Sequence, residues 1–139
     1  MLFRSETQRL VRVRRVQTLF RQSVLISYDG RCAVTGLAVT ELLRASHIKP
    51  WASCASDAER LDVFNGLLLA PNLDAAFDRG FISIADNGDV LVSERLTADA
   101  RRVLVLDLPL RVRQVAEGHR AYLRFHRERV LLGPASGIR

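Results

Sequence analysis

The sequence predicts an α+β fold in which two strands and a short helix form the centre and helices flank it on both sides. Three observations predict this arrangement. Residues 42–48 alternate loosely between apolar and polar side chains, which is typical of a strand. The apolar run at residues 65–70 predicts a second strand, followed by a short helical segment. Apolar residues at three- and four-residue steps near both ends predict the flanking helices.

The first flanking helix is predicted over residues 4–26, which contain neither Gly nor Pro. Gly30 provides a natural stop shortly after it. Its arginines fall largely on other faces than its apolar stripe, so the helix can pack by one side and present guanidinium groups on another. The predicted inward positions are Leu10, Val13, Val16 or Gln17, Phe20 and Val24.

The central segment, about residues 40–80, reads as strand, loop, strand and short helix. Pro50 cannot continue a strand ladder, and residues 51–62 form a polar loop whose length predicts an irregular path. Pro71 suits the first helical position, and Gly80 ends two turns of helix over residues 72–79. In that helix Leu73 and Phe77 share one face, and Asp74 and Asp78 share the next.

The C-terminal third predicts a hairpin over about residues 81–93, because Asn87-Gly88 separates two apolar runs. Thr97 is placed to cap a helix over residues 98–104. A final helix is expected over residues 114–131, and residues 133–137 are expected to be a frayed tail. The inward positions predicted for the final helix are Val115, Tyr122, Phe125 and Val130.

The length of 139 residues fits a single domain over residues 1–139. No apolar run approaches the roughly 20 residues of a membrane span, and the first residues lack a signal-peptide core, so we expect a cytoplasmic protein without membrane contact. Cys32 and Cys54 are not expected to form a disulfide there, and they are too few for a four-cysteine zinc site.

Charge is divided unevenly along the chain. Residues 1–31 carry a net +5, residues 32–100 carry −5 and residues 101–139 carry +6. Basic ends attract a polyanion, whereas an acidic centre repels one unless a cation lies there. A divalent metal between basic flanks accounts for both the basic ends and the acidic centre of the chain. The alternative is that these charges lie on solvated helix faces with a chance excess of arginine.

The central residues are suited to metal-assisted hydrolysis. A neutral imidazole such as that of His47 is the usual base for activating water near neutral pH. Asp74 and Asp78, one helical turn apart, are suitable ligands for Mg²⁺, which keeps several waters. The Asn65 carboxamide could hold a loop closed, orient the imidazole or bind the metal. Each residue taken singly has a structural reading, so the hypothesis rests on their order.

Several motifs occur in an order that resembles the HNH endonucleases, in a bacterial restriction-like branch. The resemblance spans about residues 16–131. It is carried by Arg31-Cys32-Ala33-Val34-Thr35-Gly36, Ser46-His47-Ile48-Lys49-Pro50-Trp51, Arg60, Asn65-Gly66-Leu67-Leu68-Leu69 and Leu73-Asp74-Ala75-Ala76-Phe77-Asp78-Arg79-Gly80.

This resemblance implies a ββα-metal (His-Me finger) core and single-metal hydrolysis of DNA phosphodiester bonds. His47 then matches the family's general base, and Asn65 matches its central asparagine. Asp74 falls where a histidine metal ligand often lies, and Asp78 matches an acidic position one turn later. Aspartates suit Mg²⁺ or Mn²⁺ better than Zn²⁺. Ser46 stands where many members have a metal ligand. These departures leave a catalytically inactive HNH-like DNA-binding module as the alternative function.

DNA is the expected partner. Arg44, Lys49 and Arg79 are predicted to contact phosphates near the cut, and Arg12 and Arg15 to contact the flanking backbone, without reading sequence. A specificity domain before residue 1 and a homodimer are left open, since cutting both strands with one site often needs two copies. A site on His119 and His126, seven residues apart, is a weaker alternative to packing.

Overall fold

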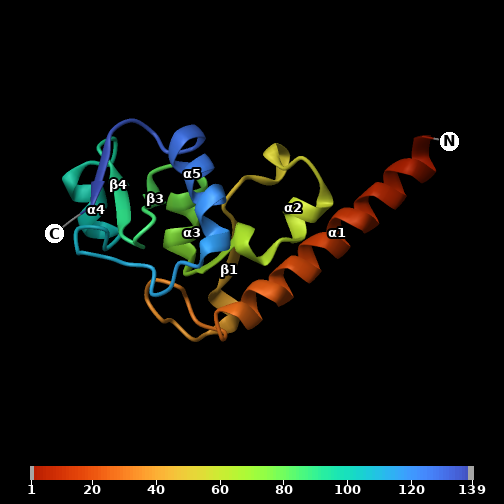
Figure 1. The fold of residues 1–139 in the computed structure, drawn as a ribbon, viewed down its shortest axis with the longest axis horizontal. Helices are drawn as coiled ribbons and strands as arrows, with labels where there is room; N and C mark the ends of the chain where they lie inside the picture. Colours follow the sequence, from red (N-terminus) through yellow and green to blue (C-terminus); the bar gives the residue numbers. More distant parts are fainter. Residues whose placement is uncertain (1, 138–139) are drawn as a thin grey trace.

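The computed structural model describes residues 2–137 and places a two-stranded sheet and a short helix at its centre (Figure 1). Strand β1 (Arg44–His47) pairs antiparallel with β2 (Gly66–Leu69), so that His47 lies opposite Gly66. Helix α3 (Pro71–Asp78) follows β2 directly and packs on β1. This is the predicted strand–strand–helix order, and the predicted α+β class is confirmed.

Helix α3 has the two faces that its sequence predicts. Pro71 stands at its start, and Leu73, Ala76 and Phe77 are buried. Asp74 lies half-buried and Asp78 exposed on the adjacent face. Gly80 follows the helix with a φ of +80°, where a side chain would collide with the carbonyl oxygen of Val130. Only glycine fits this turn without strain.

Helix α1 (Leu2–Ser27) packs against β1, β2 and α2 (Asp57–Leu61). Val16, Phe20 and Val24 are buried, as predicted. Leu10, predicted to face inward, is 58% exposed. The N-terminal turns of α1 extend beyond the body of the molecule (Figure 1), although Arg12 still reaches Asp57 of α2.

The chain between β1 and β2 is irregular, as its length predicted. It contains the short helical turns η2 (Trp51–Ser53) and η3 (Val63–Asn65) on either side of α2. The Ser56 hydroxyl caps α2 by accepting the backbone N–H of Glu59. We call residues 48–65 the active-site loop, because they follow His47 directly and contact its ring through Trp51 and the Arg60 backbone.

A second sheet lies beyond α3 (Figure 1). Strands β3 (Ile82–Ile84) and β4 (Val90–Ser93) form the predicted hairpin, and Thr97 caps α4 (Ala98–Val103). The prediction of a frayed tail was wrong, because β5 (Ala135–Gly137) adds to β4 as a third strand. Backbone bonds from Leu132 to Gly80 and from Glu94 to Pro134 bring the tail into register.

The last helix is shorter than predicted. Helix α5 covers Arg120–Arg129 after a 3₁₀ turn, η4 (Glu117–His119), instead of the whole of residues 114–131. Gly118 packs so closely on Phe64 that an added Cβ would lie 2.6 Å from the ring. The fully buried face of α5 consists of Leu123 and His126. The predicted inward positions Val115, Tyr122, Phe125 and Val130 are partly buried.

Cys32 is buried and reduced, and its sulfur accepts the backbone N–H groups of Thr35 at 3.4 Å and Ala70 at 3.3 Å. It therefore ties the turn after α1 to the end of β2. No helix within residues 2–137 combines the length and apolar character that crossing a membrane requires.

Candidate active site

His47 occupies the last position of β1, and its ring is oriented by the active-site loop. Nε2 lies 2.8 Å from the backbone oxygen of Arg60. A carbonyl oxygen can only accept, so Nε2 carries the proton and donates it. Within the described residues, Nδ1 makes no hydrogen bond. Its lone pair is therefore available to take a proton from water.

Two aromatic rings hold the imidazole in place. The Phe20 ring of α1 stacks on it with centroids 3.7 Å apart and an angle of 8° between the planes. Trp51 meets it edge-on at 5.8 Å and 84°. Burial lowers the pKa of His47 below its usual value, and the hydrogen bond to Arg60 opposes that effect. The imidazole is therefore neutral at neutral pH, as a general base must be.

His47 opens onto two overlapping cavities. One, of about 320 Å³, is lined by His47 together with Ser46, Trp51, Asp74 and Asp78. The other, of about 530 Å³, extends along α1 and shares His47, Trp51 and Asp74 with the first. The ββα arrangement thus brings His47 to the same concave surface as both aspartates of α3.

The Ser46 hydroxyl contacts the Asp74 carboxylate at this concave surface. Burial raises the pKa of Asp74, the hydrogen bond from the Ser46 hydroxyl lowers it, and the negative charge of Asp78 raises it again. These effects place Ser46 and Asp78 close to the Asp74 carboxylate. Ser46 is not itself a charged ligand; instead its hydroxyl orients Asp74 from the neighbouring strand.

The donor set fits a hard, hydrated cation. Among residues 2–137, no group of three or more His, Cys, Asp or Glu side chains is arranged to hold a metal ion. Asp74 and Asp78 supply carboxylate oxygens from one helix face. Mg²⁺ and Mn²⁺ accept such a set because water completes their coordination, whereas a structural zinc site needs about four protein ligands.

Asn65 lies outside both cavities and is completely buried. Its Oδ1 accepts the backbone N–H of Lys49 at 2.7 Å, and its Nδ2 donates to the backbone oxygen of Glu59 at 3.2 Å. These bonds join the two ends of the active-site loop. Of the three roles that the sequence allowed, its contacts match the closing of the loop.

The basic residues predicted near the cut differ in their surroundings. Arg44 lines the larger cavity, and Arg79 is exposed after α3. Lys49 is already engaged: its Nζ lies 3.1 Å from the Glu59 carboxylate and 5.2 Å from the centroid of the Phe125 ring. The phosphate contact of Lys49 stays a prediction, in which a phosphate would compete with the Glu59 carboxylate for the Lys49 ammonium.

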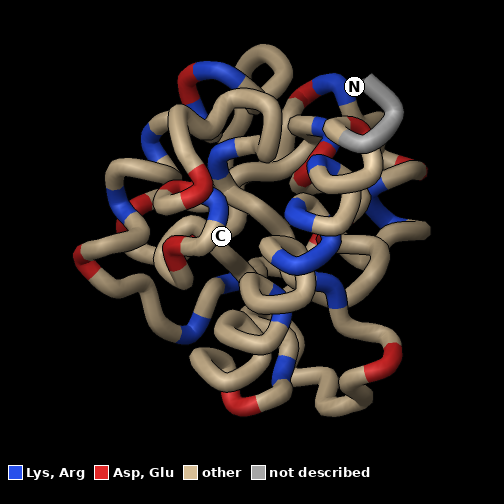
Figure 2. Tube along the Cα trace, turned by 90° about the vertical axis from the view of Figure 1, so that its right-hand side faces the viewer, with Lys and Arg blue, Asp and Glu red and all other residues tan. Residues whose placement is uncertain are grey.

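Basic positions recur along α1 (Figure 2). Arg15 is exposed, and Arg12 lies 3.8 Å from Asp57 with 63% of its side chain exposed. An ion pair this exposed holds its partners weakly. Both guanidinium groups thus remain accessible to a polyanion.

The two C-terminal histidines have structural contacts. His126 is buried, donates from Nε2 to the Phe77 oxygen at 2.9 Å and accepts the Ser83 hydroxyl at Nδ1. His119 accepts the Ala116 N–H and lies beside the Tyr28 hydroxyl. Neither residue lines the His47 cavities. Packing, the favoured reading of this pair, agrees with these contacts.

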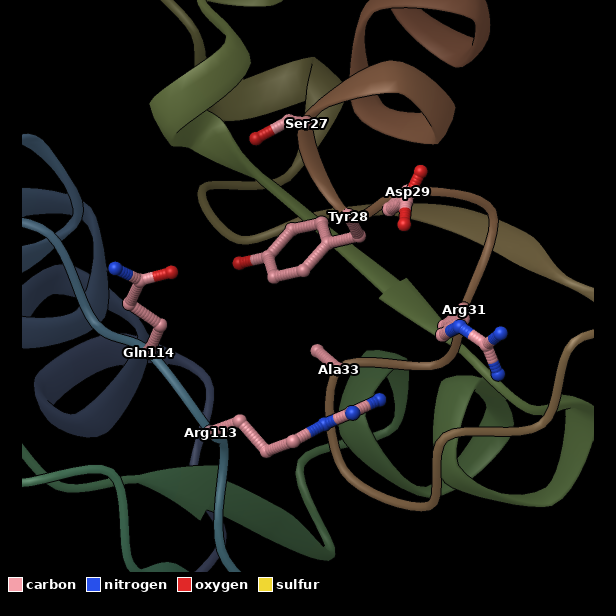
Figure 3. A pocket seen from close by; sticks show the side chains of 7 residues that line it. All are labelled: Ser27, Tyr28, Asp29, Arg31, Ala33, Arg113 and Gln114. Atoms are coloured by element: carbon pink, nitrogen blue, oxygen red, sulfur yellow. The ribbon is translucent and has the colours of Figure 1, made fainter.

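A separate cavity of about 360 Å³ lies at the C-terminal end of α1, where Tyr28, Arg31, Arg113 and Gln114 surround Ala33 (Figure 3). Arg113 donates to the backbone oxygen of Cys32 there. This cavity contains none of the predicted site residues. The candidate site is therefore the concave surface lined by His47, Asp74 and Asp78, and not this cavity.

Sequence reasoning did not predict the contacts that three residues make with His47. Phe20 was assigned to the apolar stripe of α1, but nothing in that pattern indicates that it stacks on an imidazole. Trp51 was assigned to a loop. Arg60 contacts His47 through its backbone oxygen. Every residue possesses this group, so the residue type at position 60 does not predict the contact.

Comparisons with known proteins agree with this geometry. Residues 32–85 match the family model described as HNH endonuclease. A solved structure titled "Modification dependent TagI restriction endonuclease" is similar at a TM-score of 0.52 with 23% sequence identity, covering 80% of this chain and 37% of that chain. This chain thus spans little more than a third of that protein, and the likeness shows a shared fold. A search of curated proteins gave no match. The matched segment contains β1, the active-site loop, β2 and α3, and we conclude that residues 32–85 of this chain are similar to the HNH endonucleases.

Proposed function

We propose that this domain hydrolyses DNA phosphodiester bonds with the help of a divalent metal, with His47 as the general base. One observation carries the proposal: a neutral imidazole, protonated at Nε2 and free at Nδ1, opens onto the same cavity as two aspartates. This combination provides a base and a pair of hard metal ligands within one concave surface.

In the proposed reaction, Nδ1 of His47 accepts the proton of a water molecule as that water attacks the phosphorus. The Arg60 carbonyl keeps the proton on Nε2, and the Phe20 and Trp51 rings keep the imidazole from rotating. Asn65 holds the loop that carries Arg60 closed. The fixed ring removes the entropy cost of aligning base and water.

Asp74 and Asp78 are the residues that would hold the metal, Mg²⁺ or Mn²⁺, and the Ser46 hydroxyl would keep Asp74 oriented. Such an ion supplies positive charge to the scissile phosphate and to the departing oxygen. Arg44, at the cavity wall, is placed to bind a phosphate next to the cut. Arg79 and the α1 residues Arg12 and Arg15 would hold the flanking backbone.

These phosphate contacts carry little sequence information, so we place target specificity outside residues 32–85. A restriction-like role, acting on DNA in the cytoplasm, is the form of the activity that we propose. A preceding specificity domain and a homodimer that cuts both strands are compatible extensions of it.

The direct test is cleavage of supercoiled plasmid by the purified protein with Mg²⁺, with Mn²⁺ and with EDTA. We expect nicking that requires the metal and is abolished in His47→Ala. Asp74→Ala and Asp78→Ala should lose activity and metal binding, measured by calorimetry, while keeping their folded circular dichroism spectrum. Asp107→Ala, which removes an exposed carboxylate far from the cavity, is the matched control and should cut normally.

Unchanged cleavage by His47→Ala would remove His47 from the proposed role. Retarded but intact plasmid under all metal conditions would favour the alternative of a DNA-binding module without catalysis.

A further inference from the structure

Arg60 is connected to the candidate site in two ways. Its backbone oxygen accepts the Nε2–H of His47 at 2.8 Å. Its side chain holds the same loop from the other direction, because Nε donates to the Trp51 oxygen at 3.2 Å and Nη2 donates to the Cys54 oxygen at 3.3 Å. The residue thus binds the loop that positions its own carbonyl.

Two further contacts fix the guanidinium group. Nη1 lies 2.9 Å from the Asp57 carboxylate, and the side chain is only 20% exposed. The guanidinium carbon lies 4.9 Å from the centroid of the Trp51 ring. Trp51 in turn meets the His47 ring edge-on. The Trp51 ring is therefore in contact with both the guanidinium and the proposed base.

This arrangement requires the geometry of arginine. The guanidinium donates in three directions in one plane and presents a flat face to the indole ring. A lysine ammonium is a compact charge without a plane, so it cannot bridge Trp51, Cys54 and Asp57 at once.

We propose that the Arg60 side chain is a positioning residue for the general base: it fixes the loop so that its own carbonyl holds His47 in the Nε2–H tautomer, with Nδ1 free towards the cavity. The inference rests on the proposed function of His47. Its physical basis is that a neutral imidazole exchanges between two tautomers unless a neighbouring acceptor selects one. In the Nδ1–H tautomer, the nitrogen that the protein leaves without a partner could not accept a proton.

The test compares Arg60→Ala and Arg60→Lys with Arg101→Ala. Arg101 is the matched control because it also donates to two backbone oxygens, those of Leu96 and Ser93, but in the region of α4. The first readout is the ¹⁵N chemical shifts of the histidine rings in the metal-free protein at roughly pH 8, where imidazole is neutral. The spectrum of His47→Ala assigns the His47 signals, and His119 and His126 serve as internal references. The second readout is kcat and KM for plasmid nicking.

We expect His47 in the unaltered protein to show one nitrogen protonated, at Nε2. Both Arg60 variants should show a mixture of tautomers and a kcat lowered by up to about a hundredfold, with KM nearly unchanged. Arg101→Ala should change neither, even if its stability falls to a similar degree. Failure of Arg60→Lys to restore the single tautomer would show that the guanidinium plane is needed and not the charge.

A single Nε2–H tautomer and normal kcat in Arg60→Ala would overturn the inference and leave Arg60 as a residue that only stabilises the loop. The tautomer measurement needs neither DNA nor metal. If the protein cut no DNA, the proposed function would fail, while the effect of Arg60 on the His47 tautomer could still be read.

Discussion

His47 and His126 have similar local packing but different proposed roles, one catalytic and one structural. Each imidazole stacks on a phenylalanine ring, at 3.7 Å and 8° for Phe20–His47 and at 3.8 Å and 7° for Phe77–His126. Each also donates Nε2–H to a backbone oxygen. They differ at Nδ1, which accepts the Ser83 hydroxyl in His126 and has no hydrogen-bond partner among the described residues in His47, a residue that lines a cavity. Accessibility of one nitrogen therefore separates the proposed base from a structural residue.

Gly66, the partner of His47 in the β1–β2 pair, is required by a close approach of α1. A Cβ at this position would lie 2.5 Å from Cγ2 of Val24 and 2.8 Å from Cζ of Phe20. We expect Gly66→Ala to lower the free energy of unfolding by about 1–3 kcal/mol, because α1 must shift to admit the methyl group. Urea unfolding measures this loss.

Val24→Ala removes the nearer of the two clashing atoms and provides the control. The double variant Gly66→Ala/Val24→Ala should be less destabilised than the sum of the single variants. Simple additivity would show that α1 does not press on Gly66 as described.

At the scale of elements, one face of α3 packs in the core and the other carries the proposed metal ligands. Phe77 is fully buried between the β1–β2 pair and α5, whereas Asp74 and Asp78 face the cavity. We expect Phe77→Ala to cost about 3–5 kcal/mol in the free energy of unfolding, since it leaves a large cavity and removes the stacking partner of His126. Thermal or urea unfolding measures it.

Phe64→Ala is the comparison for that loss, because Phe64 is 40% exposed and should cost clearly less. An effect of Phe77→Ala no greater than that of Phe64→Ala would mean that the two faces of α3 have been assigned the wrong way round.

At the scale of the whole molecule, His126 joins α5 to α3 and β3 through its bonds to Phe77 and Ser83. Burial lowers its pKa to about 4, with Asp78 raising and Arg127 lowering it to smaller extents. Between that pKa and the unfolded value near 6.5, the unfolded chain binds more protons than the folded one. Stability therefore falls as the pH drops through this window.

We expect His126 to contribute about 3 kcal/mol to the loss of folding free energy between roughly pH 7 and pH 4. Urea unfolding at a series of pH values measures the slope, and His126→Gln, which cannot titrate, is the comparison. His47 and His119 also have lowered pKa values and act in the same direction, so a slope remains in the variant. Parallel slopes in the two proteins would contradict the assignment.

The sequence predicted some of the candidate site residues in more detail than others. His47, Asp74 and Asp78 could be grouped from the sequence, because a strand, a proline at the start of a helix and an i,i+4 pair are all local patterns. In the structure these three residues line one cavity. The role of Asn65 could be narrowed only to three alternatives, since a carboxamide donates and accepts equally well. The contacts of Lys49 with Glu59 and Phe125 could not be predicted, because they join segments of the chain that no local pattern relates.

The amino-acid sequence by itself determined the order strand, loop, strand, helix, because alternation, Pro71 and Gly80 act over a few neighbouring residues. Tertiary structure alone decided that β5 joins β4, that α5 begins at Arg120, and that the Arg60 carbonyl meets His47. Those features depend on pairings between distant segments and on backbone groups common to every residue. No local pattern in the chain records them, so they emerge only when the elements pack.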